Sequence, residues 1–333
     1  DSFSHLFSNC AKIIEKGFLC MKEHYVIGIG AANVDINGKS INPLIMRDSN
    51  PGYMNISVGG VTRNVLENIS RIGYPVKIIT AIGSDAYGKF IYDYSTKAGI
   101  DFSHALTVKQ CPSSSYLAIL NSNGDMHLAL SDMHIIHHLT VDYLKSKSEI
   151  IENADVIVFD PCLSQSEELI PYICKNYGNR LPLFCDPVSC GYALKIKPYL
   201  QYIHTIKPNE LELEVLSDHS CKTIDDKIAA CKILIDKGIK RVFVSLGKDG
   251  CLYYDYTGQC LTRNFKEVQM VNATGAGDAF MAAVVYSYVN GFDIDMTLDF
   301  ALAGGIIAIS NKNTINPEMS LDRIKEIIRK ERG

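Results

Sequence analysis

Three features are missing from this chain of 333 residues, and each absence excludes a class of protein. Neither sign of charge dominates, because 37 acidic and 33 basic residues give a formal net charge of −4. A partner with dense negative charge, such as nucleic acid or an anionic membrane, is therefore not expected. No apolar run reaches the roughly 18 residues that a membrane-spanning helix needs. A small molecule remains as the expected ligand.

Cysteine pairs at the spacing of a metal or redox site are the third absence. The chain has 11 cysteines, an odd number, with no Cys-x-x-Cys pair and no Cys/His spacing typical of zinc sites. Thiols scattered in this way are typical of a reducing compartment, where they serve mostly as small apolar side chains. The sequence therefore predicts a cytoplasmic protein without a disulfide framework.

Residues 1–21 are expected to form an N-terminal extension of unknown role. Met21 begins a segment that leads directly into an apolar strand, whereas residues 6–20 fit a short amphipathic helix. That helix lacks the apolar core and the small-residue cleavage site of a signal peptide. With 47% hydrophobic residues in the chain, one α/β domain with a large core is predicted over residues 22–330.

Short β-branched runs alternate with helical patterns along most of the chain. The alternation predicts a mostly parallel sheet with helices on both faces, and ligands of such sheets bind beyond the carboxyl ends of the strands. Predicted strands cover residues 25–29, 76–81, 155–159, 183–185, 204–206 and 241–246. Predicted helices cover residues 61–72, 87–98, 164–176, 210–216, 224–237, 276–290, 296–310 and 321–332.

Two segments, at about 36–58 and 107–131, interrupt this alternation and are predicted to form a small β lid beside the main sheet. The second contains two runs of alternating polarity, residues 115–121 and 126–130, joined by Asn123-Gly124. Asn-Gly between two such runs is a strong signal for a β-hairpin. Ordinary edge strands remain the alternative for both segments.

One glycine-rich turn stands out as a site for chemistry. Gly275, Ala276, Gly277 and Asp278 precede an apolar pattern that predicts a helix from about Ala276. Free backbone N–H groups at a helix N-terminus attract anions, so a phosphoryl group fits there. Asp278 could then accept the proton of a substrate hydroxyl. The alternative is a structural turn with an N-capping aspartate.

Two further groups of polar residues fit a site for hydroxyl groups. Gly60 opens a predicted helix, and Asn64 offers both a donor and an acceptor to sugar hydroxyls. Asn33 and Asp35 follow the first predicted strand, where a buried carboxylate needs partners such as the two hydroxyls of a diol. Turn residues facing water are the alternative for each.

Together, these motifs resemble the ribokinase-like (phosphofructokinase-B-type) family of sugar and nucleoside kinases. The resemblance covers about residues 22–330, with its motifs in the family's order. It implies a ribokinase-like three-layer α/β/α sandwich with a mostly parallel central sheet and a small β lid. The motifs that carry it are Gly59-Gly60 with Asn64, Lys207-Pro208-Asn209-Glu210-Leu211-Glu212, Ser245-Leu246-Gly247 and Thr274-Gly275-Ala276-Gly277-Asp278.

The resemblance also implies roles for individual residues. Asp278 would be the catalytic base, and the backbone of Gly275, Ala276 and Gly277 would form an anion hole. No Walker A sequence occurs, which leaves this turn as the phosphate cradle. The sugar hydroxyls would contact Asn33, Asp35, Gly60 and Asn64, and ATP would contact Asn209, Ser245, Gly247, Gly250 and Thr274.

Two metal ions follow from the same resemblance. Mg²⁺ is expected with ATP, held through water by Asn209 and Glu212, which are three residues apart and share one face of a helix. Several family members also bind a potassium ion, and the matching ligands here are Asn272 and Thr274 together with residues 310–316. The family usually has Asp where this chain has Asn272, which removes one charge from that site.

Finer motifs resemble the pseudouridine-kinase branch of the family. This predicts ATP-dependent phosphorylation of the ribose 5′-hydroxyl of pseudouridine, in nucleoside salvage or degradation. Ser115, Asp132 and Asn121 in the lid are candidates for contacts to the base, with Lys109 and Gln110 equally placed. The branch motifs are Asp48-Ser49-Asn50-Pro51-Gly52, Gly124-Asp125-Met126, Ser131-Asp132-Met133 and Val271-Asn272-Ala273-Thr274-Gly275.

Other readings stay open at this stage. The substrate could be another ribosyl compound, such as uridine, inosine or free ribose, or the chain could be a catalytically silent nucleoside-binding protein. An oxidoreductase fits less well, because Gly28-Ile29-Gly30 lacks the third glycine of a dinucleotide loop, a position held by Asn33. Family members often form homodimers through the lid, and no long apolar edge in this lid decides the question.

Overall fold

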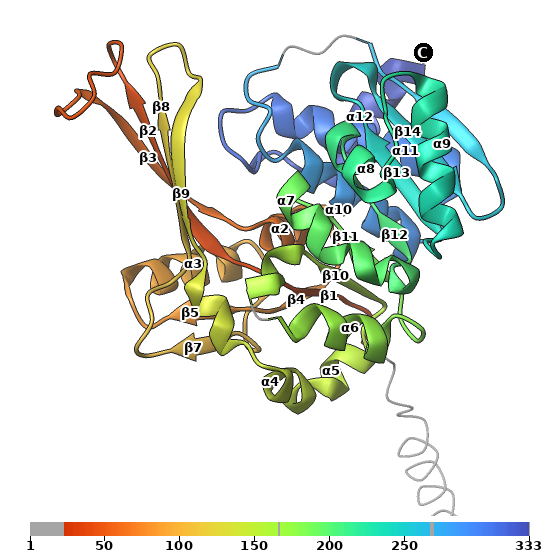
Figure 1. Ribbon diagram of the computed structural model, residues 1–333, viewed down its shortest axis with the longest axis horizontal. Coiled ribbons are helices and arrows are strands. Elements are labelled where there is room, and N and C mark those ends of the chain that lie inside the picture. The colour runs from red at the N-terminus through yellow and green to blue at the C-terminus, as the bar shows by residue number, and fades with distance from the viewer. Residues whose placement is uncertain (1–22, 166, 267–269, 333) are drawn as a thin grey trace, which may run out of the picture.

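The central element of the computed structural model is a nine-stranded sheet with the order β15-β14-β13-β12-β11-β10-β1-β4-β6 (Figure 1). The structure describes residues 23–165, 167–266 and 270–332, so the predicted extension at residues 1–21 lies outside the described residues. The strands from β6 to β13 are parallel, and β14 and β15 add antiparallel to that edge. The strands are β1 (Val26–Ile29), β4 (Val76–Ile79), β6 (Ile100–Asp101), β10 (Val156–Phe159), β11 (Leu183–Cys185), β12 (Thr205–Ile206), β13 (Arg241–Ser245), β14 (Cys251–Asp255) and β15 (Cys260–Arg263).

Side chains of this sheet alternate between two separate hydrophobic cores, one on each face. Val26 and Val156 belong to one core, whereas their neighbours Ile27 and Ile157 belong to the other. Parallel strands buried on both faces consist of nearly continuous apolar runs, which is why these segments were recognisable in the sequence. The predicted three-layer α/β/α arrangement is confirmed.

Helices cover both faces of the sheet. One core includes residues of α2 (Val61–Arg71), α3 (Ala86–Lys97), α10 (Ala276–Val289), α11 (Ile294–Ile309) and α12 (Leu321–Arg332). The other includes residues of α4 (Val141–Ser146), α5 (Ser148–Glu152), α6 (Leu169–Tyr177), α7 (Cys190–Ile196), α8 (Glu210–Ser217) and α9 (Ile224–Asp236). Short 3₁₀ turns are η1 (His134–His138), η2 (Pro161–Gln165), η3 (Lys197–Tyr202) and η4 (Gly247–Asp249).

A second, four-stranded sheet stands off from this body and forms the lid (Figure 1). Its order is β3-β2-β8-β9, and the predicted hairpin at Asn123-Gly124 is confirmed, because β8 and β9 pair antiparallel around it. Gly124 has a φ of 96°, a conformation that glycine adopts without steric cost. The strands are β2 (Asn33–Ser40), β3 (Gly52–Gly59), β8 (Ser115–Leu120) and β9 (Met126–Asp132).

Two predicted elements have different bounds in the structure. The strand predicted over residues 76–81 is two strands, because the chain leaves β4 at Thr80 and β5 (Ala81–Gly83) pairs with β7 (Leu106–Val108) in a separate small sheet. The helix predicted over residues 164–176 begins only at Leu169, after the 3₁₀ turn η2.

No helix among the described residues combines the length and the apolar character needed to cross a membrane.

Candidate active site

The glycine-rich turn leads directly into α10, as the sequence predicts. Gly275 is the N-cap of this helix and has a φ of 84°. A Cβ at this position would lie 2.0 Å from the backbone oxygen of Thr314, so a side chain is excluded by both conformation and space. The first N–H groups of α10 are thereby left at a tight, side-chain-free turn, the arrangement that binds anions.

Asp278 lies in the first turn of α10 and is 9% exposed. Burial raises the pKa of its carboxyl to about 7, and the nearby Asp186 carboxylate acts in the same direction. The side chain of Asn64 opposes the shift, because its Nδ2 donates a hydrogen bond to Oδ2 of Asp278 over 2.9 Å. A carboxyl with a pKa near neutrality can both take up and release a proton at physiological pH, which suits a general base.

A buried ion pair lies beside this turn and was not among the predicted site residues. Lys207 follows β12 and Asp186 follows the neighbouring β11, and Lys207 Nζ lies 3.1 Å from Asp186 Oδ2. Nζ is also only 3.0 Å from the place that a Cβ on Gly277 would occupy. Burial alone would lower the pKa of Lys207, but the carboxylates of Asp186 and Glu212 outweigh burial and raise it. The ammonium group is therefore charged and lies directly against the candidate anion hole.

The sequence contained a signal for this pair. Lys207 belongs to the Lys-Pro-Asn motif that was used for family resemblance, and a lysine directly after a buried strand needs a partner. Parallel strands end at the same edge of a sheet, so carboxylates that directly follow buried strands, such as Asp186 after β11, are the candidates for that partner. The strand order that makes β11 and β12 neighbours came only with the structure.

The residues predicted for hydroxyl groups lie where the lid joins the body. Asn33 and Asp35 are on β2, and Asn33 Nδ2 donates to Asp35 Oδ1 over 2.6 Å. A Cβ on Gly59 would lie 2.3 Å from the Asp35 carboxylate, so this glycine is needed for the close approach of β3. Burial raises the pKa of Asp35, while the hydrogen bond from Asn33 and the charge of Arg63 lower it.

The start of α2 is held by a buried carboxylate from a third segment. Asp160, at the end of β10, accepts hydrogen bonds from the hydroxyl and the N–H of Thr62, over 2.6 and 3.2 Å. Gly60, the N-cap of α2, has a φ of 102° and lies against the backbone of Ala31. Gly59, next to Gly60, lies against Asp35, and Asn64 on α2 donates to Asp278, so the start of α2 links the three predicted groups.

The lid register separates the candidate base contacts from these residues. Tyr116 is paired with Asp35 across β2 and β8 and therefore shares its face of the lid. Ser115 is paired with Val34, the residue before Asp35, and with Asp132 on β9. Side chains alternate along a strand, so Ser115 and Asp132 lie on the face of the lid opposite Asp35. The Asp132 carboxylate is 2.8 Å from Nδ1 of His134. The structure thus does not bring Ser115 and Asp132 together with Asp35.

Four of the five predicted nucleotide residues, all except Thr274, form a second group around the ends of β12 and β13. Asn209 and Glu212 form a capping box at the start of α8, in which each side chain accepts the other's N–H over 2.9 Å. Asn209 also bridges to Ser245 at the end of β13. Gly247 and Gly250 both have positive φ angles and close a tight turn after that strand. Burial raises the pKa of Glu212; the nearby Asp186 carboxylate raises it further, whereas the charge of Lys207 lowers it.

Asn272 and Thr274, the candidate potassium ligands, lie in the loop before α10. Asn272 Oδ1 accepts the N–H of Thr274, and Asn272 Nδ2 donates to the backbone oxygen of Lys312, each over 3.0 Å. The amide group therefore links the two loops in which the sequence predicts cation ligands.

Two hollows on the surface, of about 450 and 310 Å³, lie away from all of these residues. The first is lined by Phe292, Met296 and Phe300 with residues of α12, and the second by residues near Gly178, Pro182 and Lys240. Neither contains a carboxylate of the cluster around Asp278. The chemistry of the buried polar residues, and not cavity volume, therefore identifies the candidate site.

Comparisons with known proteins agree with this arrangement. Residues 23–321 match the family model described as pfkB family carbohydrate kinase. The chain is 34% identical to pseudouridine kinase of Escherichia coli (strain K12), with 92% of this chain and 97% of that protein covered. It is 29% identical to guanosine-inosine kinase of Exiguobacterium acetylicum, with 87% and 96% covered.

Solved structures confirm the predicted ribokinase-like fold. Ribokinase of Arabidopsis thaliana, solved with ribose and ATP, superposes on this chain with a TM-score of 0.79 at 21% identity. The match covers 91% of this chain and 98% of that one.

Proposed function

The chain belongs to the pfkB family of carbohydrate kinases and is a phosphotransferase with an alcohol group as acceptor, and we propose that it transfers the γ-phosphoryl group of ATP to the 5′-hydroxyl of pseudouridine. The observation that carries the proposal is the position of Asp278. Its buried carboxyl, with a pKa raised to about 7, accepts a hydrogen bond from Asn64, a predicted sugar contact, and is under the influence of the charge of Lys207, whose ammonium group lies beside Gly277.

The chemistry assigned to these residues is a direct transfer. The 5′-oxygen of the nucleoside attacks the γ-phosphorus, its proton passes to the Asp278 carboxylate, and the bond to the leaving oxygen of ADP breaks. The N–H groups of residues 275–277 would hold the oxygens of the transferred group. Lys207 would add a positive charge next to it, since its Nζ lies against Gly277. Asn33 and Asp35 would orient the ribose through its diol.

Magnesium fits the site through water and phosphate more than through a protein cage. Among the described residues, no three or more His, Cys, Asp or Glu side chains are grouped so that they could hold a metal ion. The side chains of Glu212 and Asn209 each accept one N–H in the capping box. Their remaining lone pairs could bind water molecules that coordinate the ion. When bound with ATP, Mg²⁺ would neutralise phosphate charge.

For potassium, this chain carries an amide at Asn272 where the family usually has a carboxylate, and we expect the effect of the ion to be small. Asn272 and Thr274 remain the proposed ligands. The Asn272 amide, however, already joins the two loops through its bond to the Lys312 oxygen. An aspartate at this position could not donate that bond, so a chain with Asn272 depends less on a cation to hold the loops together.

The choice of pseudouridine among ribosyl substrates rests on relatives and on the branch motifs. The pseudouridine kinase of E. coli is 34% identical to this chain, whereas the guanosine-inosine kinase is 29% identical. A uracil-type base offers carbonyl and N–H groups, and Tyr116 on the Asp35 face of the lid can exchange hydrogen bonds with such groups. A purine nucleoside is the second candidate.

The proposal is tested by assaying the chain with a panel of acceptors in the presence of ATP and Mg²⁺, and measuring turnover by the ADP released. We expect the highest kcat/KM with pseudouridine, ahead of uridine, inosine, guanosine, cytidine, adenosine and ribose. Preference for inosine or guanosine would move the substrate to the purine nucleosides. Phosphorylation of none of them would overturn the ribosyl assignment, and a thermal-shift screen with the same compounds would then identify a nucleoside that binds without turnover.

The lid supports a second proposal, a homodimer. The register aligns four apolar side chains in a row across the face of the lid opposite Asp35, one from each strand: Ile56, Ile36, Leu117 and Leu130. Ile56 and Leu130, on the two edge strands at the ends of this row, are 51% and 65% exposed, so the row leaves apolar surface open to a partner. A second copy of the same sheet offers a matching apolar face.

The association state tests this proposal directly. Sedimentation of the wild-type chain is expected to give a dimer, and Ile56→Lys with Leu130→Lys is expected to give monomers. Leu194→Lys is the matched control, because Leu194 is 56% exposed on α7, outside the lid. A monomeric wild type would refute the proposal.

A cytoplasmic location is part of the proposal. All cysteines in the described part of the chain are free, as expected for a reducing compartment.

A further inference from the structure

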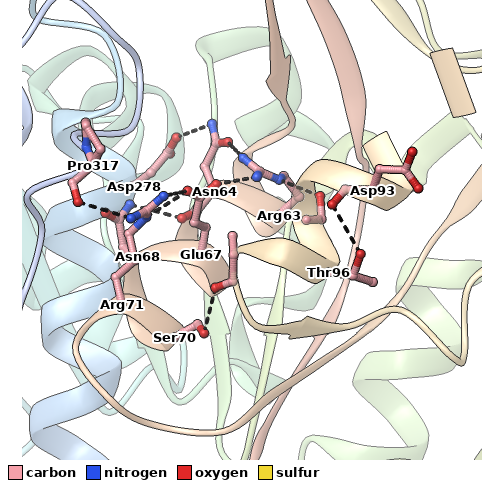
Figure 2. Close-up of polar contacts among 12 residues, drawn as sticks. Arg63, Asn64, Glu67, Asn68, Ser70, Arg71, Asp93, Thr96, Asp278 and Pro317 are labelled. Carbon is pink, nitrogen blue, oxygen red and sulfur yellow. Dashed lines mark hydrogen bonds and ion pairs between the residues drawn. The ribbon is translucent and has the colours of Figure 1, made fainter. Parts of the chain in front are cut away.

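The Asn64 side chain, which contacts Asp278, is itself held by a buried arginine. Arg63 Nη1 donates to Asn64 Oδ1 over 3.1 Å, and Asn64 Nδ2 donates to Asp278 Oδ2 over 2.9 Å (Figure 2). An Asn amide can adopt two orientations, related by a flip that exchanges its oxygen and nitrogen. An arginine has only donors, so Arg63 can bind only the oxygen. The amide nitrogen is therefore left facing Asp278.

Arg63 is fixed from several sides at once. It is fully buried, and its Nε donates to Ser95 Oγ over 3.1 Å. Its Nη2 forms an ion pair with Glu67, which is also fully buried, and the guanidinium lies 5.2 Å from the centre of the Tyr94 ring. A side chain with this many fixed partners has little freedom to turn, so the orientation of Asn64 is set by the folded body and not by the substrate.

The same helix continues the contacts toward the anion hole. Glu67 uses its other oxygen to bind Arg71, over 2.6 Å to Nη2 and 2.8 Å to Nε. Arg71 Nη1 in turn donates to the backbone oxygen of Pro317 over 3.2 Å (Figure 2). Pro317 closely follows Thr314, whose backbone oxygen is the one that packs against Gly275.

We infer that Arg63, Glu67 and Arg71 of α2 form a positioning network that presents the Asn64 N–H to the catalytic carboxyl of Asp278 and braces the loop packed on the Gly275 turn. The inference rests on the proposed role of Asp278 as the base. None of the three charged residues touches the reacting groups, so each acts through another residue. Three consecutive turns of one helix thereby join the two halves of the transfer site.

Several charges bear on the two groups that the network connects. Asp278 faces Asp186 and Asp160, which raise its pKa, and Lys207 and Asn64, which lower it. Arg63 faces Glu67 and Tyr94, which favour its charge, and Arg71, which opposes it. Of these contacts, the hydrogen bond from Asn64 to Asp278 is the one that requires Arg63 to hold the Asn64 amide in its orientation. Losing it is expected to raise the pKa of Asp278 above its present value of about 7.

The test is Arg63→Lys, which keeps the positive charge beside Glu67 but lacks the planar fork that reaches Ser95, Asn64 and Glu67 together. We expect kcat to fall about tenfold or more, with the KM for ATP unchanged and the acidic limb of the kcat–pH profile moved to higher pH. Asn64→Ala is expected to produce the same shift of the limb. The double variant is expected to show no further shift, because both changes remove one shared hydrogen bond.

Three outcomes would contradict either the positioning network or the proposed base. Arg63→Lys with a lower melting temperature but a wild-type pH profile would reduce Arg63 to a structural residue and overturn the inference. So would an equal further shift in the double variant. Asp278→Asn with near-wild-type turnover would instead refute the proposed base itself. Ser95→Ala provides a second, milder variant that leaves the charges intact, and it is expected to move the limb in the same direction by a smaller amount.

Discussion

The two carboxylates of the candidate site differ in the part of the molecule that holds them. Asp278 belongs to the body, is buried in the first turn of α10 and has other carboxylates nearby, so its pKa is raised to about 7. Asp35 belongs to the lid, remains partly exposed on β2, and its raised pKa is opposed by Asn33 and Arg63. Burial among like charges makes a group that exchanges protons, whereas a partly buried carboxylate with a hydrogen-bond donor and a positive charge nearby makes an acceptor for hydroxyls.

The largest expected effect comes from the body carboxylate. Asp278→Asn should lower kcat by a factor of about 10² to 10⁴, because an amide cannot accept the hydroxyl proton. ATP affinity, measured by titration calorimetry, should stay close to that of the wild type. Asp142→Asn is the control, since the Asp142 side chain is 90% exposed on α4. Near-normal turnover of Asp278→Asn would contradict the division between the two carboxylates.

The lysine next to Gly277 should give the second largest effect. Lys207→Met removes the positive charge beside the transferred group and leaves Asp186 unpaired, so kcat should fall about 10²- to 10³-fold. Lys89→Met is the matched control, because Lys89 is exposed and pairs with Asp93 on the surface of α3. If both variants retained the wild-type kcat in steady-state assays, Lys207 would be a purely structural residue.

The lid carboxylate should affect binding more than chemistry. Asp35→Ala should raise the KM for the nucleoside by about 10- to 100-fold, the cost of losing hydrogen bonds to a charged group. The KM for ATP should hardly change, since ATP is expected to contact the body. Initial rates with each substrate varied in turn would show the difference. Equal changes in both KM values would remove Asp35 from the hydroxyl site.

The pH dependence sharpens the same comparison. Asp278 must be ionised to act as a base, and its pKa is raised to about 7. As the pH falls through that value the carboxyl gains a proton, so kcat/KM should decline about tenfold per pH unit below it. The decline should be seen in the wild type and in Asp35→Ala alike. A pH profile that is flat between about pH 5 and pH 8 would argue against the assignment, because the Asp278 carboxyl should lose its proton within that range.

The smallest expected effect is that of potassium. Replacing K⁺ by tetramethylammonium should change kcat only slightly, because the Asn272 amide joins the two loops without an ion. Asn272→Asp removes that donor and should make the rate dependent on K⁺. Strong activation of the wild type by K⁺ would show that the amide does not replace the cation.

Much of the fold followed from local patterns. The buried strands are apolar runs because both faces of the sheet are covered, and the hairpin at Asn123-Gly124 has a turn sequence with few alternatives. The break at Thr80 was missed, because an apolar run does not show where the chain passes from one sheet to another. The start of α6 was misplaced for a similar reason, since a 3₁₀ turn and an α-helix share their first residues' pattern.

By itself, the sequence determined the elements, the glycine turn before α10 and the residue types that suit phosphoryl transfer, because these depend on neighbours along the chain. Only the tertiary structure decided which distant residues meet. The order of β11 and β12 brings Asp186 to Lys207, and the packing of α2 on α10 brings Asn64 to Asp278. The lid register placed Ser115 and Asp132 on the face opposite Asp35, a difference of one residue in pairing. Strand order, helix packing and register are set by the burial of whole elements, which no local pattern contains.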